Sequence, residues 1–255
     1  MKRIQLQFSV AAGKRLIARG LASREDIREA AAEHTVVIIT GTTNSYLAEE
    51  LLSALGLEKN ADGTSFDRRG FYRGIIRGGL YKGEVRQQAE DVVISGGERI
   101  TGKTIYDAAP EMGAGDIIFK GANAVNLRDR QAGILIGNPQ LGTIMPAVQA
   151  SVGRQVRLIH PVGLEKRVEC PLGELAVQTN GPDTAGLKFY PTPGEIYTEL
   201  EAIRDLTGAS AKLLASGGVD GMEGGIVLLA EGDSEALEKC RALEKELRAE
   251  PPYQV

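Results

Sequence analysis

The sequence feature that most constrains the fold is the stretch from Val36 to Leu52. A β-branched run, Val36 to Ile39, ends at Thr40-Gly41, and small polar residues separate it from a helical pattern of apolar side chains. This order is typical of a buried parallel strand that passes through a short turn into a helix. Free N–H groups in the first turn of such a helix can hold an anion. The stretch predicts an α/β protein with a site for a phosphate or carboxylate group.

Further short apolar runs end in glycine or proline along the chain. They lie at 91–97, 115–121, 133–137 and 156–162, with a helix expected over 143–152. Two helices, 8–20 and 23–32, come before the first strand; the former stops at a glycine and the latter begins with acidic residues. Short strands separated by helices or loops indicate a mostly parallel, Rossmann-like sheet.

The composition changes after Glu174. Two turn-forming segments, 180–183 and 191–194, interrupt the chain. Around and beyond them the pattern predicts strand 187–190, helix 195–206, strand 211–216, strand 226–230 and helix 234–248. This order is most of a ferredoxin-like α+β unit. We therefore expect an α/β ligand-binding domain over residues 1–175 and a ferredoxin-like domain over residues 176–255.

Composition excludes several classes of function. The 255 residues carry a formal charge of −4, whereas a dedicated nucleic-acid binder is usually basic. Cys170 and Cys240 lie far apart, so no disulfide framework or zinc site is indicated, and the two isolated histidines, His34 and His160, do not suggest a metal centre. The N-terminus has no apolar signal segment and no run reaches membrane-spanning length. We expect a cytoplasmic protein that binds no metal, nucleic acid or membrane.

Residues 67–82 concentrate cations and aromatic residues among glycines, without a helical or strand period. Long irregular segments inside a compact domain are uncommon and often functional. One interpretation is a lid whose arginines, Arg69 and Arg73 among them, meet an anionic ligand. The other is a solvated loop that packs on a partner subunit.

Two short segments carry the candidate binding residues. In the first, Gly41 allows a tight turn, Thr42 and Thr43 offer hydroxyls, and Asn44 either caps the helix or contacts the ligand. The second segment follows strand 115–121 at the sheet edge where open α/β sheets bind ligands. Its candidates are Lys120 for an anionic oxygen and Gly121 and Asn123 beside it, unless Asn123 only caps a helix.

A glycine-rich stretch, 216–225, joins two of the later strands. Its backbone amides could form an anion-binding concavity. A loose connection or a subunit contact is the simpler interpretation.

These segments resemble parts of one superfamily, the ribose-phosphate isomerase, glucosamine-phosphate deaminase and CoA-transferase-like fold. Thr40-Gly41-Thr42-Thr43-Asn44 is similar to its phosphate-holding loop, and the segment from Asp116 to Asn126 is similar to its strand with active-site groups. Residues 142–144 and 159–166 resemble later strands of its lactate-utilisation branch. The resemblance covers about residues 35–170 and implies a site for a phosphate or its equivalent.

The sequence departs from this superfamily where the isomerases carry proton-transferring acids. Asn123 and Ala124 stand there, and an amide is no general base near neutral pH. A transferase-type glutamate nucleophile has no counterpart either. The remaining carboxylates to consider as acid or base are Asp67, Glu98, Asp116 and Glu165.

Two functions stay open. The first is an enzyme of unknown reaction on a small phosphorylated or carboxylated metabolite, which the basic segment favours because lids exclude water. The second is a non-catalytic metabolite sensor or assembly protein with the same pocket, which the missing acids favour. No cofactor is assigned, and a homodimer is expected from base rates.

Overall fold

The computed structural model describes residues 2–60, 63–73 and 90–253. Its main sheet has six strands in the order β10-β8-β5-β2-β3-β4. The strands are β2 (Thr35–Ile38), β3 (Val92–Ser95), β4 (Glu98–Ile100), β5 (Ile117–Phe119), β8 (Arg157–Pro161) and β10 (Glu195–Tyr197). Neighbours from β10 to β2 are parallel, whereas β3 and β4 pair antiparallel. The expected α/β class is confirmed, with a sheet that is mixed.

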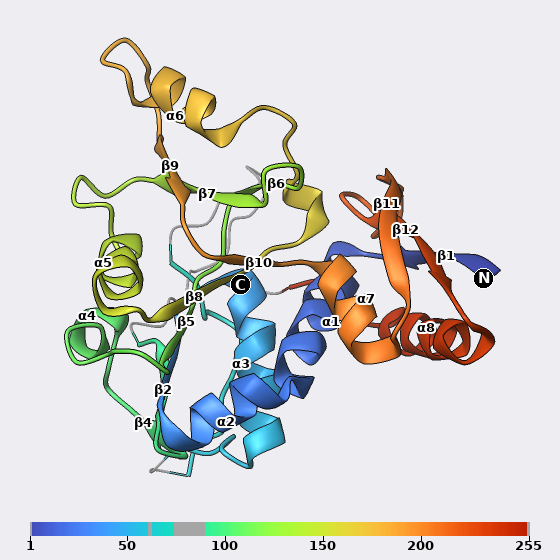
Figure 1. Cartoon of the computed structure of the whole chain (residues 1–255), viewed down its shortest axis with the longest axis horizontal. Helices are drawn as coiled ribbons and strands as arrows, with labels where there is room; N and C mark the ends of the chain where they lie inside the picture. Colours follow the sequence, from blue (N-terminus) through green and yellow to red (C-terminus); the bar gives the residue numbers. More distant parts are fainter. Residues whose placement is uncertain (1, 61–62, 74–89, 254–255) are drawn as a thin grey trace.

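Helices cover both faces of this sheet (Figure 1). Val36 and Ile38 belong to the apolar cluster that contains α1 (Val10–Ser23), α2 (Glu25–Glu33), α3 (Thr42–Leu55) and α7 (Glu199–Thr207). Val37 and Ile39 belong to a second cluster, with α4 (Ile105–Ala108) and α5 (Ile144–Arg154). Since successive side chains of a strand point to opposite faces, burial on both sides explains the unbroken apolar run.

Two smaller antiparallel sheets flank the main one (Figure 1). One joins β1 (Lys2–Phe8), β12 (Ile226–Gly232) and β11 (Ser210–Ser216), with α8 (Ser234–Leu247) packed on it. The other joins β6 (Ala124–Asn126), β7 (Gln131–Ile136) and β9 (Lys188–Thr192), next to α6 (Leu172–Asn180). Residues 133–137 therefore lie outside the main sheet in which the sequence pattern placed them. The division into two domains at residue 175 stays a prediction.

Two predicted helix boundaries are wrong, for physical reasons. Helix α1 continues past Gly20 to Ser23. Gly20 does not end the helix, because this glycine allows α1 to pack closely against α7, where an added Cβ would lie 3.0 Å from the Ala202 Cα. Helix α7 begins at Glu199, not at 195, because residues 195–197 pair with β8 and Thr198 forms a capping box with Glu201.

Helix α3 follows β2, as the sequence predicts; it ends at Leu55, and Gly56 caps it in the left-handed conformation. Within the described ranges, no helix is long and apolar enough to cross a membrane.

Candidate functional site

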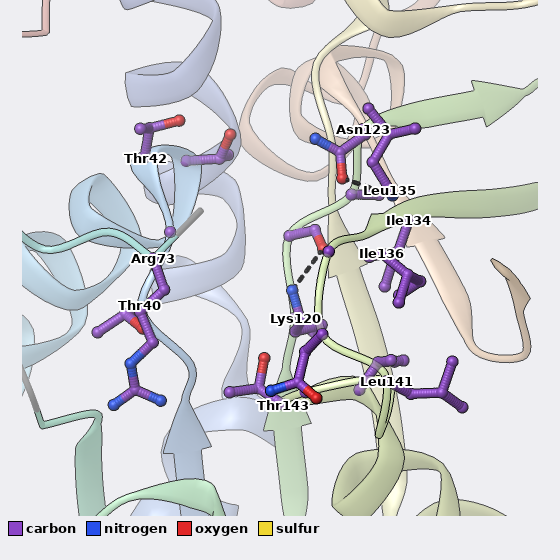
Figure 2. A pocket seen from close by; sticks show the side chains of 18 of the residues that line it. Thr40, Thr42, Arg73, Lys120, Asn123, Ile134, Leu135, Ile136, Leu141 and Thr143 are labelled. Atoms are coloured by element: carbon purple, nitrogen blue, oxygen red, sulfur yellow. Dashed lines mark hydrogen bonds between the residues drawn. The ribbon is translucent and has the colours of Figure 1, made fainter. Parts of the chain in front are cut away.

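A cavity of about 920 Å³ opens at the carboxyl ends of β2 and β5 (Figure 2). Residues from both ends of the sequence line it: Lys14 of α1, the segment 40–43, Arg73, Tyr106, the segment 120–123, residues 134–138 and 141–144, Lys166 and Tyr253. The parallel pairing of β2 with β5 brings the two predicted binding segments to one edge. The cavity thus lies where the sequence places a site.

The amino end of α3 forms one wall of the cavity. The helix begins at Thr42, and the backbone N–H of Gly41 donates to the Phe71 carbonyl at 3.1 Å. Among the described residues, none accepts from the N–H groups of Thr42, Thr43 and Asn44, as is usual in a first helical turn. The backbone of Gly41 is extended (φ 178°), and the nearest contacts of an added Cβ lie at 3.8 Å. A Cβ at this position would therefore meet no close contact, and the turn does not depend on the glycine.

Two buried threonine hydroxyls lie at the same wall. Thr40 is 4% exposed and Thr43 is 2% exposed, and in the described part of the chain neither Oγ1 atom has a hydrogen-bond partner. A buried hydroxyl without a partner costs about 1–3 kcal/mol, so such groups in a cavity wall are explained if a ligand completes their hydrogen bonding. Thr40 lies in the turn between β2 and α3, and Thr43 lies in the first turn of α3, both within the stretch that the sequence singled out.

Asn44 has a structural role in this turn. Its side chain is fully buried, and Nδ2 donates to the carbonyl of Ile39 at 2.7 Å and to that of Phe119 at 3.0 Å. The amide thus ties the end of β2 to the end of β5 from behind the cavity wall, and Asn44 does not line the cavity. Arg69 lies elsewhere as well, exposed and paired with Asp67 at 2.7 Å.

Four cations line the cavity, whereas its lining within the described ranges contains no carboxylate. They are Lys14, Arg73, Lys120 and Lys166. Burial, with the nearby charge of Lys166, lowers the pKa of Lys14 to about 8. Burial also lowers the pKa of Lys120 to about 8. Like charges held together at partly desolvated positions are unfavourable, so this surface favours an anion.

Asp91 lies just behind the cavity wall. Its buried carboxylate accepts from the Thr40 N–H at 2.8 Å and the Ile105 N–H at 2.7 Å, and the guanidinium of Arg73 lies 3.6 Å away. The carboxylate therefore fixes the end of β2 and holds Arg73 at the rim. Asp91 is not among the site residues predicted from the sequence, although an aspartate at the start of an apolar strand is a detectable signal.

A second buried acid, Glu199, lies behind the two cavity lysines Lys14 and Lys166. Its Oε2 accepts from the Leu164 N–H at 3.0 Å, and its Oε1 packs against Gly13, where an added Cβ would lie 2.5 Å away. Burial, with the neighbouring charge of Glu165, raises the pKa of Glu199 to about 8. Glu165 Oε1 lies 4.0 Å from the Lys166 Nζ. The two carboxyl groups of Glu165 and Glu199 can therefore hold a proton close to the cavity near neutral pH.

The opposite wall is mostly apolar. It includes Ile134, Leu135, Ile136 and Leu141 (Figure 2). Asn123 stands at its edge, and its Oδ1 accepts from the Leu135 N–H at 3.0 Å. The alternative that Asn123 caps a helix is wrong, because strand β6 follows it. Gly121 and Lys120 continue the floor between the two walls.

The other candidate residues lie away from the cavity. Asp116 accepts from the N–H groups of Thr35 and Gly113 and so stabilises turns at the amino ends of the strands. Glu98 is exposed on β4, and residues 216–225 form the exposed connection between β11 and β12. His160 is buried, and its ring nitrogens lie 2.6 Å from the Lys120 carbonyl and 2.8 Å from the Pro193 carbonyl. Across the described residues, no cluster of potential metal ligands is found.

Comparison with known proteins gives no relative: no family model, no curated protein and no solved structure matches the chain.

Proposed function

We propose that the chain binds a small phosphorylated or carboxylated metabolite in the cavity at the β2–α3 turn. One observation supports the proposal most strongly. Four basic side chains and the amino end of α3 line the same cavity, and its described lining residues include no carboxylate. Helix amino ends and basic side chains both favour negative charge. The unpartnered hydroxyls of Thr40 and Thr43 supply further hydrogen-bond donors at the same wall.

The apolar wall orients the ligand. An anionic group on the α3 side leaves the rest of the molecule against β7 and Leu141. The cavity of about 920 Å³ has room for a metabolite larger than the anion alone. We therefore favour a metabolite with an apolar or planar portion next to its charged group.

We favour an enzymatic function, and two sets of titratable side chains support it. Lys120 has a lowered pKa at the cavity floor, and the Glu165–Glu199 pair lies behind the cavity lysines. Perturbed pKa values of this kind cluster at functional sites. The second candidate, a metabolite sensor, is favoured by the absence of a carboxylate in the described part of the lining.

The resemblance to the isomerase, deaminase and CoA-transferase superfamily is kept as part of the proposal. Its two key segments contribute residues 40–43 and 120–123 to the lining of one cavity, which supports a shared Rossmann-like ancestry of the main sheet. The order β11, β12 and α8 supports the ferredoxin-like assignment of the C-terminal unit. A cytoplasmic location and a homodimer stay predictions.

The test is a thermal-shift screen with inorganic phosphate, sugar phosphates, hydroxy acids and CoA esters, followed by calorimetry on each hit. Binding to the native state raises its melting temperature by mass action. The diagnostic variant is Thr43→Val, which removes a buried hydroxyl but keeps the side-chain shape, and the matched control is Thr101→Val on an exposed turn. We expect Thr43→Val to weaken binding about tenfold, as for one lost hydrogen bond, and the control to bind like the wild type. Equal affinity in all three proteins, or no stabilisation by any anion, would contradict the proposal.

A further inference from the structure

Lys120 occupies the centre of the cavity floor. It directly follows β5, which lies between β2 and β8 in the main sheet. Figure 2 shows its side chain between the threonines of the β2–α3 turn and the apolar wall of Ile136 and Leu141. Among the described residues, its Nζ has one hydrogen bond, at 3.4 Å to the Gly121 carbonyl, and no ion pair. The amine is thus held loosely at the place where the body of a bound metabolite would lie.

The other two cavity lysines have side-chain partners, whereas the hydrogen bond of Lys120 is to a backbone carbonyl. Lys14 Nζ lies 3.4 Å from the Thr42 hydroxyl and faces the ring of Tyr253. Lys166 Nζ lies 4.0 Å from a Glu165 oxygen. Lys14 therefore stands at the amino end of α3, where the anionic group is expected, and Lys120 remains as the reactive amine.

The charged groups around Lys120 come from several elements. Lys166 and Arg73 disfavour its ammonium form, Asp91 favours it, and the buried ring of His160 contacts the carbonyl of Lys120 itself. Burial is the largest influence, and the resulting pKa of about 8 leaves a neutral amine in about one molecule in ten at pH 7. An ordinary lysine has a neutral fraction several hundredfold smaller. Lysines desolvated beside other cations form imines with carbonyl substrates.

We infer that Lys120 is a nucleophile that forms an imine with an aldehyde or ketone group of the anionic metabolite. This inference rests on the proposed function and names its substrate class, an oxo compound that carries a phosphate or carboxylate. The neutral Nζ attacks the carbonyl carbon and forms a C–N bond, and a proton transfer gives a carbinolamine. Its hydroxyl then leaves as water while the C=N double bond forms, with no change of oxidation state. Thr143 lines the same cavity and offers a hydroxyl there (Figure 2).

The experiment uses pyridoxal 5′-phosphate, a phosphorylated aromatic aldehyde, as the probe. The full chain is treated with limiting probe and cyanoborohydride, which reduces an imine to a stable amine, and the modified lysine is mapped by peptide mass spectrometry. We expect Lys120 to be modified at pH 7 about a hundredfold faster than the exposed Lys245, with a rate that rises through pH 8. Inorganic phosphate should slow the modification of Lys120 and leave that of Lys245 unchanged.

Lys120→Arg, which keeps the charge, should lose this label, and Lys245→Arg should keep it. Because the label is mapped on the wild-type chain, the result does not depend on the folding of either variant. Modification of Lys14 or Lys166 in place of Lys120, or modification of Lys120 no faster than that of Lys245, would overturn the inference.

The experiments distinguish a failure of imine formation at Lys120 from a failure of anion binding. If phosphate compounds stabilise the chain but Lys120 does not react, the imine is refuted and anion binding stands. If Lys120 reacts equally fast with pyridoxal and its phosphate while no anion stabilises the chain, the proposed function fails.

Discussion

The replacement Glu199→Gln tests the electrostatics behind the cavity. Glu199 is buried, its Oε2 accepts from the Leu164 N–H, and Glu165 and the lysines Lys14 and Lys166 lie around it. Its folded-state pKa of about 8 lies above the ordinary value of 4.5 because burial and the charge of Glu165 both oppose ionisation. The folded chain therefore binds a proton at Glu199 that the unfolded chain releases between these two values.

This difference in pKa between the folded and unfolded states determines how the free energy of unfolding changes with pH. Between pH 4.5 and pH 8 the folded state binds more protons, so the free energy of unfolding falls as the pH rises. The full difference in pKa corresponds to at most about 5 kcal/mol, and coupling to Glu165 makes about 2–3 kcal/mol a realistic expectation. Glutamine is neutral and can still accept from Leu164, so the variant should lack this fall and become the more stable protein above pH 7.

The assay is urea unfolding of wild type and variant from pH 5 to pH 8, with Glu238→Gln on the exposed face of α8 as control. The difference between wild type and Glu199→Gln isolates one group, because every other titrating residue is common to both. The reasoning is refuted if this difference does not change with pH, or if the wild type gains stability relative to the variant as the pH rises.

Three further predictions concern packing, the cavity wall and acid stability. Gly20→Ala should cost about 1–3 kcal/mol in urea unfolding because its Cβ would meet α7, whereas Gly173→Ala in α6, with open space at the Cβ position, should be neutral or stabilising. Asp91→Asn should cost about 2–4 kcal/mol and weaken phosphate binding, because an amide NH2 group replaces one of the two oxygens that accept from the N–H groups of Thr40 and Ile105; unchanged stability would contradict this. Burial lowers the pKa of His160 from 6.5 to about 4, so the stability of the wild type relative to His160→Gln should rise between pH 4 and pH 6.5, by up to about 3 kcal/mol. NMR titration of His160 checks the assignment, and an ordinary pKa would refute it.

The sequence predicts those parts of the fold that local patterns specify. The run Val36–Ile39 and the helix that ends at Gly56 are readable because burial on both faces and a left-handed helix end each leave a distinct residue pattern. The opposite case is β1, in which Ile4, Leu6 and Phe8 alternate with polar residues. Its partner β12 lies more than 200 residues away in sequence. Local propensity carries no information on such a partner.

Local sequence patterns predict the candidate site only in part as well. The segments 40–43 and 120–123 follow strands, so the sheet-edge rule places them together. Lys14, Lys166 and Tyr253 reach the cavity only through the packing of α1, the turn after β8 and the C-terminal segment. Asn44 has a residue type suited to ligand contact, yet its amide is used by two backbone carbonyls. Residue type identifies donors, and only the tertiary structure shows where they are directed.

The pairing of β1 with β12 has a consequence for synthesis on the ribosome. Lys2 lies opposite Gly232 and Phe8 opposite Ile226, so β1 is synthesised more than 200 residues before its partner strand. Until then Leu6 and Phe8, both buried in the finished protein, stay exposed on a nascent chain. At elongation rates of about 5–20 residues per second this interval lasts about ten seconds or more. During this interval β1 is therefore open to binding by chaperones or to self-association.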